Sequence, residues 1–295
     1  MTLIVAQKHI NLQKSIAVTC SVIVLALSGS GLSADAAETR SGNSRQTFAD
    51  WCRQKDSLSP ETKHTVEELL KKAGTTECDE ANQKLSSLTK LDLSDNQISD
   101  IKPLQSLTNL TSLWLIFNQI NDIKSLQSLT NLTEIELSFN QINDIKPLQS
   151  LTNLTSLSLS GNQISDIKPL ASLTNLTSLS LSRNQINDIK PLASLTNLTW
   201  LDLNSNQIND IKPLESLTNL NLLWLYTNQI NDIKPLASLT NLTVFNLSAN
   251  QISDIKPLAS LTNLTLLFLS GNPITPKTCP IKPESICKWE PEPKP

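Results

Sequence analysis

The stretch LTNLTSLSLSGNQISDIKPLAS, from Leu151 to Ser172, is the unit from which most of this chain is built. The same order of residues returns every 22 residues, and its most constant member is an asparagine, Asn162 in this copy. In the second copy Ser125 stands in the place of a proline, and the ninth copy breaks off after Ile274. The nine asparagines are Asn96, Asn118, Asn140, Asn162, Asn184, Asn206, Asn228, Asn250 and Asn272. So regular a period indicates a repeat architecture.

Each copy contains an L-x-L segment, and its alternation is that of a β-strand with the leucines on one side. In the quoted unit Leu157 and Leu159 are expected to face inward. The other apolar residues of that core layer are Ile164, Ile167, Leu170 and Leu173. One layer cannot bury both of its faces, whereas stacked copies make a continuous apolar column. Because an amide both donates and accepts, the buried asparagine is expected to satisfy turn backbone in its own and the neighbouring coil.

This pattern is the leucine-rich repeat signature, and it predicts an α/β repeat solenoid over residues 88–274. The strands are expected to form a parallel sheet on the concave face of an arc. A unit of 22 residues leaves too few residues for a long outer helix. Short 3₁₀ or irregular turns around Lys-Pro-Leu are therefore expected on the convex face.

Residues 37–87 are predicted to form a helical N-terminal cap over the first coil. Ser59 and the proline after it have the chemistry of a helix start, and apolar residues follow at helical spacing until Gly74. Phe48 and Trp51 are expected to pack beneath this helix. At the other end, a small C-terminal cap is predicted for residues 275–289 and an extended Pro-rich tail for 290–295.

The first 36 residues are predicted to be a signal peptide. Lys8 and Lys14 precede an apolar run from Ser15 to Leu27, and cleavage is expected after Ala36. The run is shorter than the about 20 residues of a membrane span. No stable membrane span is therefore expected after cleavage, although a retained N-terminal anchor is the alternative. The mature chain is expected to be secreted or to lie in the periplasm or cell envelope.

Five cysteines are present, and Cys20 lies inside the predicted signal peptide. The other four are Cys52, Cys78, Cys279 and Cys287. An even number in an exported chain predicts disulfides. A rigid array separates the first two from the last two, and bridged Cα atoms lie within about 7 Å of each other. The pairs Cys52–Cys78 and Cys279–Cys287, one in each cap, are therefore predicted.

Composition and motifs give little support to catalysis. The hydrophobic content is 39 % and the formal net charge −3, so a nucleic-acid partner is not expected. After cleavage His64 is the one remaining histidine, and it falls in the predicted cap helix. Glu134 and Glu136 resemble a glycosidase pair, but they fall on an open sheet where nothing would desolvate either carboxyl group. No enzyme, cofactor or metal site is predicted.

Two recurrent motifs are read as structural. Pairs such as Asp166 and Lys168 recur in eight copies, as a turn cap beside a solvated charge. Tripeptides of the type N-x-S/T, for example at Asn153, resemble glycosylation acceptors. Most of them occupy one repeat position, so the repeat itself explains them, and whether any is modified stays open.

The chain resembles the bacterial internalin-type leucine-rich repeat proteins through units such as the quoted one, over residues 88–274. The resemblance implies an exported, slightly curved solenoid that binds a macromolecule, usually a protein, on its inner sheet. There are departures from the family pattern. After residue 274 there is no immunoglobulin-like domain or LPxTG motif, and the front cap has a cysteine pair rather than an evident calcium-loop pattern. A role in host invasion is therefore not carried over.

Variation between the copies is concentrated in four outward slots, which lie six, four, two and one residues before each asparagine. The chain has five Trp, five Phe and one Tyr, and seven of these eleven aromatic residues occupy such slots. The front cluster consists of Trp114, Ile116, Phe117, Glu134, Glu136 and Phe139. The rear cluster consists of Trp200, Asp202, Leu222, Trp224, Tyr226, Val244 and Phe268. Serines fill most of the slots between the two.

Exposed aromatic residues beside carboxylates are typical of protein interfaces. We therefore predict a monomer that binds a protein partner through the two clusters. Three other interpretations remain. The tryptophans could be stacking platforms for an envelope glycan, or the chain could be a passive spacer. Aromatic residues also favour strands for structural reasons alone, and Phe117 and Phe139 could simply stack on each other.

Overall fold

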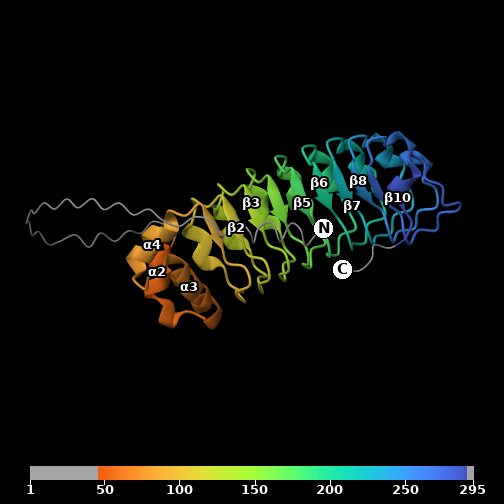
Figure 1. Cartoon of the computed structure of the whole chain (residues 1–295). Helices are drawn as coiled ribbons and strands as arrows, with labels where there is room; N and C mark the ends of the chain where they lie inside the picture. Colours follow the sequence, from red (N-terminus) through yellow and green to blue (C-terminus); the bar gives the residue numbers. More distant parts are fainter. Residues whose placement is uncertain (1–45, 291–295) are drawn as a thin grey trace, which may run out of the picture. The chain divides into compact units, whose positions relative to one another are not determined.

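A computed structural model of the chain describes residues 46–290. The predicted signal peptide with Cys20, and residues 291–295 of the predicted tail, lie outside the described residues. The described part begins with a helical cap (Figure 1). Its elements are α2 (Phe48–Arg53), the 3₁₀ turn η2 (Lys55–Ser57), α3 (Pro60–Ala73) and α4 (Cys78–Ser86).

Helix α3 begins and ends where the sequence predicts. The side chain of Ser59 accepts a hydrogen bond from the backbone N–H of Thr62, and Gly74 ends the helix with a φ of 65°. The apolar face of α3 and the ring of Phe48 are buried, and Trp51 packs against the same core. The cap is joined to the first coil by hydrogen bonds. Thr65 Oγ1 donates to the carbonyl oxygen of Asp100 at 2.6 Å, and His64 Nε2 lies 2.7 Å from that of Asn96.

The repeats form one parallel sheet of ten strands in chain order. Neighbouring strands pair residues one repeat apart, as Leu157 does with Leu179, so equivalent slots line up in rows. The strands are β1 (Lys90–Asp92), β2 (Ser112–Trp114), β3 (Glu134–Glu136), β4 (Ser156–Ser158), β5 (Ser178–Ser180), β6 (Trp200–Asp202), β7 (Leu222–Trp224), β8 (Val244–Asn246), β9 (Leu266–Phe268) and β10 (Cys287–Lys288). The nine strands of the repeats are as predicted. The tenth was not foreseen, because β10 comes from the C-terminal cap and has no repeat pattern.

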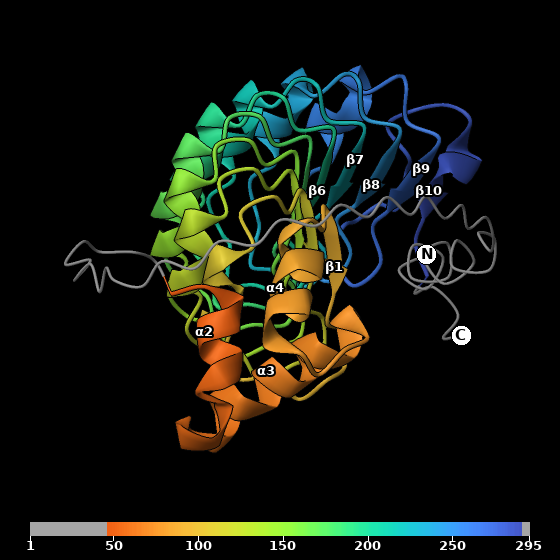
Figure 2. The same cartoon turned by 90° about the vertical axis from the view of Figure 1, so that its left-hand side faces the viewer.

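Between successive repeat strands, from β1 to β9, the chain returns through a five-residue 3₁₀ helix on the side opposite the strands (Figure 2). These helices are η3 (Lys102–Ser106), η4 (Lys124–Ser128), η5 (Lys146–Ser150), η6 (Lys168–Ser172), η7 (Lys190–Ser194), η8 (Lys212–Ser216), η9 (Lys234–Ser238) and η10 (Lys256–Ser260). At the start of η6, Asp166 Oδ1 accepts a hydrogen bond from the backbone N–H of Lys168 at 3.0 Å. The same contact recurs in the other copies, so the aspartate is the turn cap that the motif indicates. The predicted solenoid fold class is confirmed.

A ladder of buried asparagines connects the coils. Asn140 Nδ2 donates to the carbonyl oxygens of Leu115 at 2.9 Å and Leu137 at 3.1 Å. Its Oδ1 accepts from the backbone N–H of Ile120 at 3.0 Å. With a longer contact to the carbonyl oxygen of Ser138 at 3.3 Å, one side chain thus bonds to four backbone groups, and two of them belong to the preceding coil. Equivalent contacts recur along the array beside a leucine and isoleucine column that is almost wholly buried.

The two caps are each closed by a disulfide. Cys52 is bonded to Cys78 and Cys279 to Cys287, with Cα separations of 5.6 and 5.8 Å. A short 3₁₀ turn, η11 (Glu284–Ile286), leads into β10. Across residues 46–290, no helix combines the length and hydrophobicity that a membrane crossing needs.

Candidate interaction surface on the strands

The outward residues of the strands form continuous rows because the register pairs equivalent slots. One row carries the middle slot of each copy, from Asp92 through Trp114 and Glu136 toward Trp224. Another carries Trp200 and Leu222 side by side. Side chains that are 22 residues apart in sequence are therefore neighbours on this face. Members of a cluster that occupy equivalent slots of adjacent copies therefore lie next to one another.

The slot directly before each asparagine does not belong to the strand. Its residue has a positive φ in every copy, for example 55° at Phe117 and 66° at Gly161. Sequence reasoning treated this slot as an ordinary outward position and missed the left-handed turn. The glycines Gly161 and Gly271 in the same slot were the available signal, because glycine adopts a positive φ without strain.

Two rings of the front cluster stack on this turn. The ring centroids of Phe117 and Phe139 are 4.7 Å apart and their planes differ by 16°. The ring of Phe139 also lies over Gly161, where an added Cβ would come within 2.7 Å of it. Phe139 is thereby half-buried, whereas Phe117 remains 54 % exposed. The stacking alternative is thus correct for these two residues, and the stack still leaves one ring face open.

Trp114 lies between two carboxylates. In register its neighbours are Asp92 on β1 and Glu136 on β3, and all three side chains are partly exposed. Each carboxylate accepts one backbone N–H, that of Ser94 for Asp92 and that of Ser138 for Glu136, both at 2.9 Å. The two groups are therefore held in place by one oxygen each. A carboxylate has two oxygens, so acceptor capacity is left on each.

In the rear cluster, Trp200, Leu222 and Val244 lie side by side on β6, β7 and β8 and are all half-buried. Tyr226 follows β7 and is 44 % exposed. Its backbone N–H donates to Asn204 Oδ1 at 2.7 Å, which fixes the turn that carries it. The rear cluster therefore presents apolar area with one phenol hydroxyl.

Two residues of the rear cluster are not available on the surface, contrary to the prediction. Phe268 is only 7 % exposed, because its ring stacks with that of Trp224 at 6.4 Å and β10 lies along its other side. Asp202 is only 9 % exposed. Its carboxylate accepts from the backbone N–H of Asn204 at 3.0 Å and from Ser180 Oγ at 3.4 Å. Both side chains support the cluster instead of facing a partner.

Burial also changes the ionisation of Asp202. Desolvation raises the pKa of its carboxyl group above the ordinary value. The hydrogen bonds from Asn204, Ser182 and Ser180 and the charge of Arg183 act against this, and the net shift remains upward. The pKa of Asp202 thus reflects its burial more than its hydrogen bonds.

Serine side chains between the clusters are linked by hydrogen bonds. Ser138 Oγ lies 2.6 Å from Ser158 Oγ, and Ser182 Oγ donates to Ser160 Oγ at 3.0 Å. Ser160 in turn contacts Ser180, which reaches Asp202. These hydroxyls satisfy one another across the strands. These five serines, in two hydrogen-bonded groups, form the serine floor between the clusters.

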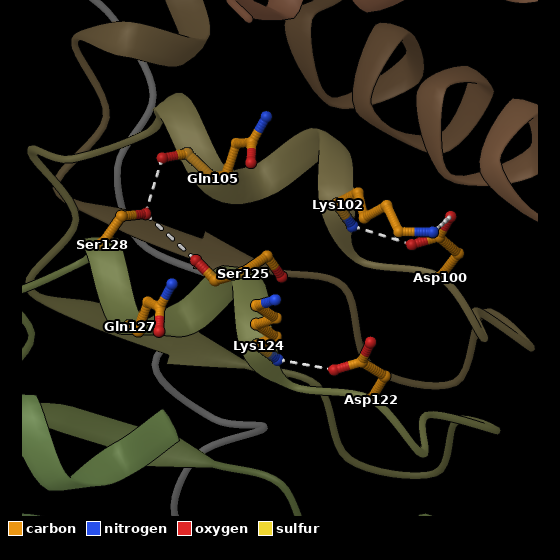
Figure 3. Close-up of a pocket in the computed structure, with 8 residues that line it drawn as sticks. All are labelled: Asp100, Lys102, Gln105, Asp122, Lys124, Ser125, Gln127 and Ser128. Atoms are coloured by element: carbon orange, nitrogen blue, oxygen red, sulfur yellow. Dashed lines mark hydrogen bonds and ion pairs between the residues drawn. The ribbon is translucent and has the colours of Figure 1, made fainter. Parts of the chain in front are cut away.

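A pocket of about 260 Å³ lies on the turn side, between η3 and η4 (Figure 3). Ser125 lines it in place of the repeat's proline, and Ser128 Oγ donates to the carbonyl oxygens of Gln105 and Ser125. Both aspartates of the pocket have local partners. Lys102 Nζ pairs with Asp100, and the backbone N–H of Lys124 donates to Asp122. The missing proline ring accounts for this hollow.

Comparisons with known proteins agree with this geometry. The family described as Leucine Rich repeats (2 copies) matches residues 86–128, 108–150, 130–172, 152–194, 196–238 and 240–278. No curated protein matches the chain.

Several solved structures are similar to this chain. Internalin C2 of Listeria monocytogenes is 39 % identical, with a TM-score of 0.66, and the match covers 70 % of this chain and 92 % of that one. The internalin inlF of the same species is 35 % identical, with a TM-score of 0.60 and coverages of 71 % and 69 %.

A more distant match is the ectodomain of the Arabidopsis thaliana receptor kinase GASSHO1/SCHENGEN3, solved in complex with CASPARIAN STRIP INTEGRITY FACTOR 2. It is 30 % identical, with a TM-score of 0.57 and coverages of 65 % and 25 %. The family match, together with the similarity to the two Listeria proteins, identifies the chain as a bacterial leucine-rich repeat protein of the internalin type.

Proposed function

We propose that this chain is an exported binding module that recognises a protein partner through the front and rear clusters. One observation supports this most directly. Within residues 46–290 the exposed large hydrophobic side chains are Phe117 and Tyr226, and one belongs to each cluster. Solvent exposure of a ring costs free energy that burial against a partner recovers. Recognition surfaces are built from such side chains on rigid scaffolds.

The distance between the clusters suits a protein partner. Trp114 lies on β2 and Trp224 on β7, so five strand steps separate them. At about 4.8 Å per step this is roughly 24 Å. A standard interface covers about 800 Å² on each partner, which is a patch of this width. One folded partner can therefore cover both clusters and the serine floor between them.

Leucine-rich repeat domains are general protein-interaction modules, and the Arabidopsis ectodomain was solved in complex with CASPARIAN STRIP INTEGRITY FACTOR 2. The absence of a catalytic role is part of the proposal. His64 is engaged with Asn96 at the cap junction. Export is supported by the N-terminal pattern and by two disulfides, since disulfides persist in oxidising compartments.

The experiment is a pull-down from native extracts with the chain from Ala37 onward, comparing three forms. The double variant Trp200→Ala/Trp224→Ala removes the rear rings, and Phe117→Ala removes the exposed front ring. Lys168→Ala, on the turn side, is the matched control. Loss of the same protein band in both cluster variants, with the control unchanged, is expected.

Parallel retention on immobilised polysaccharide separates the rivals. If the wild-type chain is retained on the polysaccharide and the Trp200→Ala/Trp224→Ala variant is not, the partner is a glycan and not a protein. If neither protein capture nor polysaccharide retention changes in any variant, the chain is a spacer and the proposal is wrong. A sedimentation measurement of the wild-type chain checks the expected monomer.

A further inference from the structure

The front of the sheet, which holds the front cluster and the first strand beside it, differs from the rest in its charge. Four carboxylates lie in the outward slots of the first three copies, and Lys90 is the one cationic side chain among those slots. The four are Asp92, Asp95, Glu134 and Glu136. Within residues 46–290 the ion pairs all involve other acidic side chains. None of the four therefore forms an ion pair within the described residues.

We propose that the front cluster binds a cationic side chain of the partner, an arginine or a lysine, over the ring of Trp114. The inference rests on the protein-binding function proposed above and names the chemistry that its front half selects. An aromatic face attracts a cation through its quadrupole. The flanking carboxylates of Asp92 and Glu136 reinforce this attraction from both sides.

The geometry favours a cation because the ring and both carboxylates are already held in position before a partner binds. Strand neighbours lie about 4.8 Å apart, so a group above Trp114 is within reach of both adjacent carboxylates. Each carboxylate is oriented by its bond to a backbone N–H and retains its second oxygen. Little side-chain ordering is then left to oppose binding. The stacked rings of Phe117 and Phe139 supply apolar area beside the cation.

The rear cluster shows what the same register gives without two exposed carboxylates. Trp224 lies between Asp202 and Asn246, the counterparts of Asp92 and Glu136. Asp202 is buried and bonded to Ser180, and the amide of Asn246 is uncharged. Selection for a cation is therefore expected at the front cluster and not at the rear.

The test selects random peptides displayed on phage against the chain from Ala37 onward. Peptides that depend on Phe117 should be enriched in arginine or lysine. For a selected peptide, the double variant Asp92→Asn/Glu136→Gln should weaken binding about tenfold. These amides keep the oxygen that accepts the backbone N–H, so the fold is preserved. The control Asp166→Asn/Asp188→Asn removes two carboxylates from the turn side and should leave binding unchanged.

Two further measurements separate charge from shape. The same peptide with citrulline in place of arginine should lose more affinity than the double variant causes, because citrulline loses the attraction of both the ring and the carboxylates, and Trp114→Leu should reduce the preference for arginine over citrulline. Peptides that need Phe117 but show no enrichment in cations, or no response to citrulline, would overturn this inference and leave the binding function standing. If no selected peptide depends on either cluster, both proposals are wrong.

Discussion

Trp114 and Trp224 occupy the same slot of the repeat, yet they sit in different surroundings. Each stands between two side chains of the neighbouring strands. At the front those neighbours are partly exposed carboxylates, whereas at the rear they are the buried Asp202 and an uncharged amide. Phe268 covers the rear tryptophan further by stacking on it. The repeat fixes where a side chain points, and residues one or two copies away decide what it presents.

The same ladder of buried asparagines lies beneath both clusters, and its removal is the prediction with the largest effect. Asn140→Ala, below the front cluster, and Asn228→Ala, below the rear cluster, should each lower the free energy of unfolding by about 4 kcal/mol. Each change leaves one buried N–H without a partner, at about 1–3 kcal/mol. It also removes one of the two asparagine donors from each of two carbonyl oxygens, at about 0.5–1.5 kcal/mol for each lost hydrogen bond. Denaturant titration of both variants measures this. A loss in one variant only would show that the ladder does not support the two clusters equally.

The caps provide the next contrast. Replacing both cysteines of Cys52–Cys78 by serine should cost about 3.5 kcal/mol, and the same change at Cys279–Cys287 about 2.5 kcal/mol. The difference follows from loop length, since the sequence separations are 26 and 8 residues. Unfolding free energies of the two double variants test the order. The reverse order would mean that the rear cap, with β10 beside Phe268, contributes more to the array than loop closure alone.

A smaller effect distinguishes the turns that follow the strands. Gly161→Ala and Gly271→Ala should each cost about 1–2 kcal/mol, because both positions have a positive φ. The consequences for the surface differ. A Cβ at Gly161 meets the ring of Phe139, whereas a Cβ at Gly271 meets the backbone of Ala249. Only Gly161→Ala should therefore weaken binding of a peptide that needs Phe117. Equal effects of the two variants on peptide binding would show that the peptide does not contact the stacked rings of Phe117 and Phe139.

The periodic features were predictable from the sequence because their causes are local or repeated. The period of the asparagines implies stacking, and the L-x-L alternation implies a strand. The start of α3 follows from Ser59 and its proline, and the end from Gly74. Nothing in these arguments depends on how side chains pack over the sheet.

The features that were missed depend on that packing. Phe268 and Asp202 occupy outward slots, so the sequence predicted exposure. The ring of Trp224 and the hydroxyl of Ser180 cover them from strands that are one or two repeats away. Strand β10 has only two residues, too few for a pattern. For the candidate site, the alternation in the sequence predicts which side chains face outward and which of them share a row. The exposed fraction of each side chain depends instead on the side chains of neighbouring strands.

The smallest effect concerns the buried carboxylate. Burial raises the pKa of Asp202 above its ordinary value, so the folded state holds this proton more tightly than the unfolded state does. Its contribution to stability is therefore fully present below the unfolded value of 3.8 and is lost as pH rises through the folded pKa. Asp202→Asn keeps the acceptor for Asn204 and removes the ionisation. Relative to wild type, this variant should gain stability as pH rises through that window, measured by denaturant unfolding at several pH values. Glu134→Gln, a charge removal on the exposed front, is the control, and an equal gain there would show that the effect comes from net charge and not from burial.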